Sequence, residues 1–201
     1  MEFKKLIFTL VIASLFVVTF MWGTSYAYYT STGGTNINVT TGNVDTNLTV
    51  VFDQSEYMNI KTGVPILASD VDTYASKSVF SLVPNSTLLN GYDVAINVSL
   101  VDIKIDDALK VSAFKYKLTC NNGSSDTVLS SGNGSNFTST VLSNDSLSLG
   151  SMSTALSSFD VTKSYTCTFR VWLEESGSSQ NELMNKNFSG LIKVGSAIRK
   201  S

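Results

Sequence analysis

The sequence predicts an all-β fold, a jelly-roll-like sandwich of mostly antiparallel strands that follows an N-terminal signal helix. Beyond residue 27, many short runs alternate apolar and polar residues and are separated by turn-forming residues. The chain has two prolines, Pro65 and Pro84, and neither interrupts a central run. Charged residues make up only 15% of the chain, so serine, threonine and asparagine supply much of the polar surface. Strands at this spacing are typical of two sheets packed around one core.

The first 27 residues have the three parts of a secretory signal. Met1–Lys5 carries two lysines, Leu6–Trp22 is almost wholly apolar, and the small residues Ser25 and Ala27 precede the expected cut between Ala27 and Tyr28. The apolar run of 17 residues is also long enough to remain as a membrane anchor. Both interpretations place the remainder outside the cytoplasm, either secreted or at the cell surface.

Removal of this segment leaves 174 residues, which fit a flexible segment over residues 28–36 and one sandwich domain over residues 37–201. This portion has 12 basic and 15 acidic residues, for a net charge of −3. Such a mild charge gives no electrostatic reason to bind nucleic acid, or to bind a membrane except through the N-terminal segment.

The expected strands are taken in chain order, and each rests on β-branched or alternating residues bounded by turn signals. They cover residues 37–40, 44–52, 79–83, 92–105 and 114–120, a partner strand that begins near 128, and residues 165–173 and 188–194. In the run 92–105 the apolar residues change phase after Leu100, which predicts a β-bulge or bend near Leu100–Val101.

Three connections have less regular patterns. Residues 53–78 lack alternation and predict a helix or a long connection. Residues 130–136 are rich in Gly, Ser and Asn and predict a mobile loop. Residues 141–158 are rich in Ser and Leu, and a short helix is expected around residues 152–158.

Histidine is absent from the sequence, which excludes Ser-His-Asp and Cys-His catalysis and the commonest ligand for zinc and copper. Cys120 and Cys167 are the only cysteines, and in an exported chain they predict one disulfide between two strands or two sheets. The alternative is a pair of buried free thiols.

The acidic residues offer weak candidates for a metal or catalytic site. Asp102, Asp106 and Asp107 form one group, and Asp70 with Asp72 forms another. Neither group has the spacing of a calcium loop, so turn residues in contact with solvent are expected. The adjacent Glu174 and Glu175 point to opposite faces if they lie in a strand, which disfavours a catalytic pair. We therefore expect no catalytic residue, metal or cofactor.

Three stretches of the sequence resemble the TasA and camelysin-like proteins of Gram-positive bacteria. The first is Gly23-Thr-Ser-Tyr-Ala-Tyr-Tyr-Thr with Asn36-Ile-Asn-Val-Thr-Thr-Gly-Asn-Val-Asp; the second is Ser78-Val-Phe-Ser-Leu-Val-Pro-Asn with Gly91-Tyr-Asp-Val. The third comprises residues 165–174, Met184-Asn-Lys-Asn-Phe188 and the last strand. The resemblance implies a secreted jelly-roll domain that forms fibres of a biofilm matrix.

In TasA fibres the N-terminal segment of one subunit completes the sheet of the next, which is a form of β-strand addition. The resemblance implies that the corresponding donor segment here includes Tyr28, Tyr29, Ile37 and Val39. The alternative is an ordinary disordered tail that leads into the first strand.

The resulting functional hypothesis is a secreted or cell-surface structural protein that associates with itself, or with a related surface protein, in extracellular fibres. A monomeric surface adhesin that binds through its loops is the alternative. A camelysin-like metallopeptidase is a further alternative, although the absence of histidine leaves it only carboxylates and cysteines as ligands.

Overall fold

The computed structural model describes residues 37–38, 48–195 and 198–200. These residues belong to one compact unit that covers residues 34–201. The predicted signal helix, the cleavage site and most of the donor segment lie outside the described residues.

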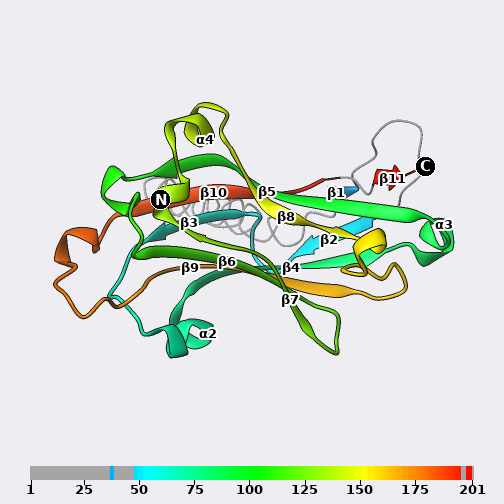
Figure 1. The fold of residues 1–201 in the computed structure, drawn as a ribbon, viewed down its shortest axis with the longest axis horizontal. Coiled ribbons are helices and arrows are strands. Elements are labelled where there is room, and N and C mark those ends of the chain that lie inside the picture. The colour runs from blue at the N-terminus through cyan, green and yellow to red at the C-terminus, as the bar shows by residue number, and fades with distance from the viewer. Residues whose placement is uncertain (1–36, 39–47, 196–197, 201) are drawn as a thin grey trace, which may run out of the picture. The chain divides into compact units, whose positions relative to one another are not determined.

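Two antiparallel sheets pack face to face as a β-sandwich (Figure 1). Sheet A has the order β1-β2-β4-β9-β6-β7, and its strands are Ile37–Asn38, Leu48–Phe52, Ser76–Pro84, Tyr165–Leu173, Phe114–Asn121 and Asp126–Asn133. In sheet B, β5 (Asp93–Ile105) pairs with β8 (Ser146–Ser153) on one side and with β10 (Asn187–Val194) and β11 (Ile198–Lys200) on the other. The strand β3 (Tyr57–Lys61) pairs with the far side of β10.

Helices in the described residues are short and lie in the connections between strands. The α-helices are α2 (Val71–Tyr74), α3 (Ser86–Leu89) and α4 (Ser139–Ser143). The 3-10 helices are η1 (Ala68–Asp70), η2 (Asp107–Leu109), η3 (Gly134–Asn136), η4 (Thr154–Leu156) and η5 (Asn181–Leu183). No helix among the described residues is both long and apolar enough to cross a membrane.

The core lies between the inner faces of the two sheets and follows the alternation of their strands. In β9, Tyr165, Cys167, Phe169, Val171 and Leu173 are all buried, as the alternating sequence predicts. A cluster of aromatic rings joins the two sheets at one end of the core. The ring centroids of Phe114 in β6 and Phe188 in β10 are 5.1 Å apart, and Phe137 lies 5.7 Å from Phe188. Such contacts stabilise the sandwich through both apolar burial and ring geometry.

The predicted phase change in β5 is confirmed, one residue beyond the expected place. Leu100 and Ile103 are both buried, and Asp102 between them has a φ of 53°. Three steps along β5, from Val101 to Lys104, oppose two steps along β10, which is a β-bulge. The bulge returns the apolar side chains of β5 to the core.

The expectations for the connections were confirmed only in part. Residues 130–136 are not a loop, because β7 continues to Asn133 and η3 follows it. The connection at 53–78 contains strand β3 in addition to short helices. Residues 146–153 form strand β8, and the expected helix after it is the single turn η4. Backbone pairing with neighbouring strands defines β3, β7 and β8, although their own sequences alternate poorly.

Candidate functional site

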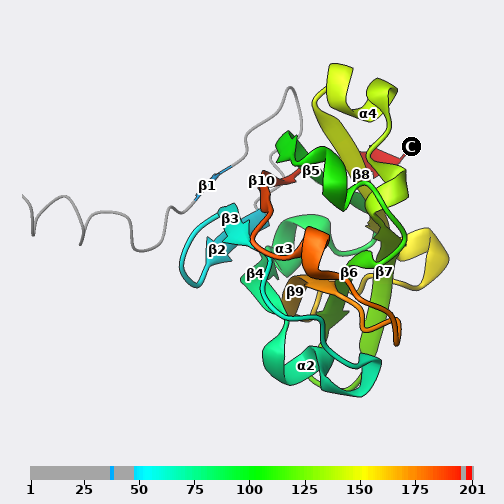
Figure 2. The ribbon, with the colours of Figure 1, turned by 90° about the vertical axis from the view of Figure 1, so that its left-hand side faces the viewer.

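Along one edge of the sandwich, β4 of sheet A and β10 of sheet B are each paired with an outer strand over only about half of their length. The strand β2 covers the edge of sheet A by pairing with residues 80–84 of β4. The chain then crosses through residues 53–56 to sheet B, where β3 pairs with residues 187–191 of β10. Figure 2 shows β2 and β3 together along this edge. One half of β4 and one half of β10 therefore have no partner strand on this side among the described residues.

The first open stretch, which we call the β4 gap, lies between β3 and the first half of β4. The backbone of Val79 points toward this edge, because its C=O accepts a hydrogen bond from Asp53 N at 3.0 Å. Lys77, two residues earlier, carries its N–H and C=O on the same side, beyond the end of β2. The gap has a volume of about 410 Å³ and is lined by residues 53–55, 57–60 and 76–79.

The free side of β3 forms the opposite wall of the β4 gap. Ile192 N donates to Glu56 O at 2.9 Å and Thr62 N donates to Lys186 O at 2.8 Å, so even-numbered residues of β3 face β10. The backbone of Asn59 therefore points away from β10 and toward the open side. Both walls of the gap are strand edges that can pair with an added strand.

The second open stretch, which we call the β10 gap, lies beside the last half of β10. Gly195 N donates to Asn97 O at 2.7 Å, whereas the backbone of Val194 faces the side that β3 leaves uncovered. This gap has a volume of about 790 Å³. Its lining comprises Val50, Phe52, Glu56, Val101, Asp102, residues 144–146 and residues 191–195.

The other edge of the sandwich is closed by contact between β7 and β8. A bulge in β8 places Gly150, with a φ of 102°, against the backbone of Leu129. A Cβ atom at residue 150 would lie 2.7 Å from Leu129 O, closer than real contacts allow. The two sheet edges thus approach each other closely at Gly150 and Leu129, although no ladder of hydrogen bonds joins β7 to β8 among the described residues.

The donor residues predicted from the resemblance are only partly visible. Tyr28, Tyr29 and Val39 lie outside the described residues, as does the junction of Ala27 and Tyr28. Ile37 lies in β1 and pairs with Val50 of β2, so this residue continues sheet A beyond β2. The short strand β1 leaves both gaps uncovered, because it pairs with β2 alone.

The structure contains the predicted disulfide between Cys120 and Cys167. The two residues are direct cross-strand partners in β6 and β9, their Cα atoms are 4.0 Å apart, and both are fully buried. The bridge is therefore of the cross-strand kind, within sheet A. It covalently fixes the register of these two neighbouring inner strands.

The acidic residues considered as metal ligands are dispersed among local contacts. Asp106 accepts from Asn187 N at 2.8 Å, and Asp70 accepts from Ser69 Oγ at 3.1 Å. Asp72 forms an ion pair with Arg170 at 3.2 Å. Asp102 occupies the β5 bulge and is exposed. The described residues contain no group of three His, Cys, Asp or Glu side chains able to hold a metal ion.

Among the described residues, two carboxyl groups have clear electrostatic shifts, those of Asp107 and Asp160. A hydrogen bond from Lys110 and its positive charge lower the pKa of Asp107. Hydrogen bonds from the side chain and backbone of Thr162 lower the pKa of Asp160. Both shifts favour the ionised form at a surface turn, which is the opposite of a general acid held protonated for catalysis.

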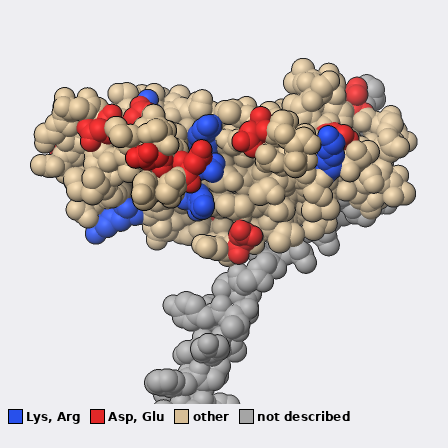
Figure 3. Space-filling model, turned by 90° about the horizontal axis from the view of Figure 1, so that it is seen from below, with Lys and Arg blue, Asp and Glu red and all other residues tan. Residues whose placement is uncertain are grey.

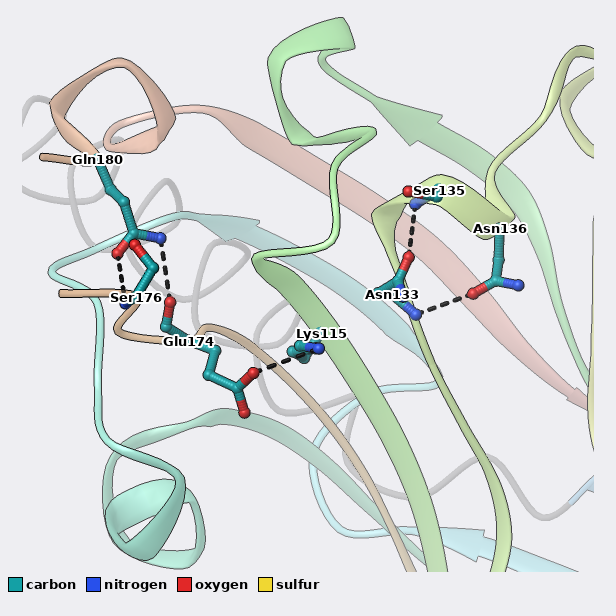
Figure 4. Close-up of polar contacts among 7 residues, drawn as sticks. All are labelled: Lys115, Asn133, Ser135, Asn136, Glu174, Ser176 and Gln180. Carbon is teal, nitrogen blue, oxygen red and sulfur yellow. Dashed lines mark hydrogen bonds and ion pairs between the residues drawn. The ribbon is translucent and has the colours of Figure 1, made fainter. Parts of the chain in front are cut away.

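Glu174 and Glu175 lie just beyond β9 and have separate structural partners. Glu174 Oε2 is 3.2 Å from Lys115 Nζ, whereas Glu175 Oε1 accepts from Gly177 N at 2.7 Å. Figure 4 shows the side chain of the buried Gln180 reaching back to the chain that leaves β9. Its amide nitrogen donates to Glu174 O at 3.0 Å, and its amide oxygen accepts from Ser176 N at 3.1 Å. These contacts fix the turn after β9 and do not converge on a common substrate position.

The same figure shows how the β7 terminus is held by a polar contact of its own. Asn133 accepts from Ser135 N at 2.9 Å, and Asn136 accepts from Asn133 N at 2.9 Å. This reciprocal arrangement caps η3 and explains why the Gly- and Asn-rich stretch is ordered.

No protein-family model matches the sequence, and no curated protein matches it either. One similar solved structure is a variant of Xylanase10C from Cellvibrio japonicus in complex with xylopentaose. The sequence identity is 7% and the TM-score is 0.31, with 81% of this chain and 26% of that chain covered. This chain thus spans about a quarter of the xylanase chain, and a likeness this distant carries no functional argument.

Asn59, Lys77 and Val194, whose backbones border the gaps, were not identified from the sequence. Their side chains are ordinary for strand residues, and the relevant groups belong to the backbone. Only the pairing of segments far apart in the sequence shows which backbone groups lack a partner strand.

Proposed function

We propose that this chain is an exported structural subunit that associates into extracellular fibres by β-strand addition. The observation that carries the proposal is the half-covered edge, where β3, β4 and β10 all present backbone groups beside open gaps. An added strand satisfies these groups through a ladder of hydrogen bonds, and its alternating side chains fill the gap. The resemblance to TasA supplies the donor, the segment around residues 28–39.

Further features support this proposal. The buried disulfide is common in exported proteins, and it agrees with the secretory signal in the sequence. Successive strands from β3 to β6, and again from β8 to β10, alternate between the two sheets, and we propose that they form a jelly roll. The low charge of the chain is compatible with close packing of subunits.

The proposal is tested with the mature chain, residues 28–201, and with prolines at the edges of the β4 gap. The double variant Asn59→Pro and Lys77→Pro removes two N–H groups that face the gap, while the ladders with β10 and β9 keep their own donors. The matched double variant Asn59→Thr and Lys77→Thr changes the same side chains and keeps both N–H groups. Negative-stain microscopy and sedimentation then measure filament formation.

We expect filaments from the wild type and the threonine variant, and monomers from the proline variant and from a chain that lacks residues 28–39. Near-ultraviolet circular dichroism checks that each variant is folded, and the truncated chain keeps the test valid if the proline variant unfolds. The proposal is overturned if the wild type stays strictly monomeric under all assembly conditions. Equal assembly of the truncated chain and the wild type would overturn the role of the donor segment.

A further inference from the structure

We propose that the outer face of sheet A binds a neutral saccharide in a small polar pocket over β6 and β9, the Thr119 pocket. The pocket has a volume of about 220 Å³. It is lined entirely by polar side chains, namely Asp72, Lys117, Thr119, Asn121, Asp126, Thr166, Thr168 and Arg170. It shares no lining residue with the β4 or β10 gap, so this proposal does not depend on fibre assembly.

The floor of the pocket is held rigid by the fold. Thr119 lies directly opposite Thr168 in the β6–β9 ladder, and Asn121 lies opposite Thr166. Between these two outward-facing rows the inward-facing Cys120 is bonded to Cys167. Because the disulfide lies directly behind the threonines, the spacing of their hydroxyl groups is fixed before any ligand arrives.

Two of the lining side chains contain buried polar atoms without a hydrogen-bond partner. These atoms are Thr119 Oγ1 and Arg170 Nε, and Trp172 Nε1 is a third on the same face of β9. They make up three of the four such atoms among the described residues, the fourth being Ser153 Oγ. A buried polar group without a partner destabilises the folded state, and native proteins contain few of them. Thr119 and Arg170 line the pocket, so a ligand bound there can supply the partners that these two side chains lack.

The charges around the pocket favour an uncharged ligand. Lys117 and Arg170 are balanced by Asp72 and Asp126, and the Asp72–Arg170 ion pair measures 3.2 Å. Asn121 Nδ2 also donates to Asp126 Oδ1 at 2.7 Å. Figure 3, which views the molecule from the side of sheet A and α2, shows acidic and basic groups next to each other within a mostly uncharged surface. With two positive and two negative groups, the pocket has no net charge that would attract an ion of either sign.

The mixture of hydroxyl, amide, carboxylate and guanidinium groups matches the hydroxyl groups of a sugar ring. Each sugar hydroxyl both donates and accepts, and a guanidinium N–H pair can bind two oxygens at once. The volume is below the roughly 300–1,000 Å³ of sites for drug-sized molecules, so it suits a single ring. Thr119 Oγ1 and Arg170 Nε are shielded in the free protein, so binding includes a shift of the long lining side chains.

The variant Thr119→Val tests the site, because valine has nearly the same shape as threonine and lacks only the hydroxyl. Glucose, galactose and N-acetylglucosamine are titrated separately into isotope-labelled mature protein, and backbone amide shifts are followed by NMR. Glucuronic acid serves as the anionic probe. Thr49→Val, on the outer face of β2, is the matched control for loss of a threonine hydroxyl from sheet A.

With at least one neutral sugar, we expect saturable shifts at Thr119, Thr168 and Arg170. Thr119→Val should weaken that binding by roughly three- to tenfold, the effect of one lost hydrogen bond, and Thr49→Val should not change it. Thr119→Val should also melt at the same or a higher temperature than the wild type, because the lost hydroxyl has no partner in the free protein. The proposal is wrong if no neutral sugar shifts these amides, if only glucuronic acid does, or if Thr119→Val binds as the wild type.

Discussion

Removal of the Cys120–Cys167 bridge should cost the protein much of its stability. The two cysteines are 47 residues apart, and closing a loop of that length in the unfolded chain corresponds to about 4 kcal/mol in the chain-entropy model. For a domain of this size each kcal/mol changes the melting temperature by about 2–4 °C, so the expected decrease is about 8–16 °C. The double variant Cys120→Ala and Cys167→Ala is the perturbation.

Urea unfolding is measured for the wild type, the double variant and the reduced wild type. The comparison separates the effect of the cross-link on stability from the effect of the packed sulfur atoms. The reduced wild type lacks only the bond, whereas the variant also leaves small cavities in a fully buried region. Both should show a larger dependence of the unfolding free energy on urea, since an unbridged unfolded chain exposes more surface. Equal unfolding free energies for oxidised and reduced wild type would refute the reasoning.

Two further predictions concern the closed edge and the core. Gly150→Ala should lower the free energy of unfolding by about 3 kcal/mol, because the new Cβ meets Leu129 O, whereas Gly177→Ala, with a φ of 73° and open space around it, should cost only about 1–2 kcal/mol. Thermal unfolding compares the two, and equal losses would contradict the close approach at Gly150. Burial raises the pKa of Tyr116, so its contribution to stability is complete below about pH 10, the ordinary tyrosine value, and is lost as the pH rises through the folded pKa. Tyr116→Phe should remove this loss of stability. Urea unfolding at increasing pH measures it, and an equal decrease in the unfolding free energy of the wild type and the variant would contradict the prediction.

The strands that were predictable from the sequence are those with one face in the core. In β6 and β9 every second residue is buried, and in β5 the alternation holds from Ile96 to Leu100 and changes phase at the bulge, so the apolar pattern of the sequence reports the geometry directly. The strand β7 contributes no fully buried side chain, and its pairing with β6 uses backbone groups that every residue has. Serine and glycine in such a strand have the composition of a loop, which explains the wrong prediction for residues 130–136.

The disulfide could be predicted from the sequence, whereas the open edge of the sandwich could not. Two cysteines have only one intramolecular pairing, so composition suffices to name the partners of a bridge. The gaps arise because β2 ends at Phe52 and its chain crosses to the other sheet before β4 is fully covered. Strand length and crossover position depend on long-range packing, and no local pattern in residues 53–60 encodes them. The unpartnered Thr119 and Arg170 atoms likewise depend on which side chains lie beside them.

The ring closed by Cys120 and Cys167 has a consequence for resistance to proteases. Between the two cysteines the chain contains β7 and α4 and, from the opposite sheet, β8. A protease that cuts an exposed site in this stretch, such as the turn at 123–125 or helix α4, leaves the two fragments covalently joined. Both fragments also remain anchored in the core by buried strands, so a single cut releases no part of the domain.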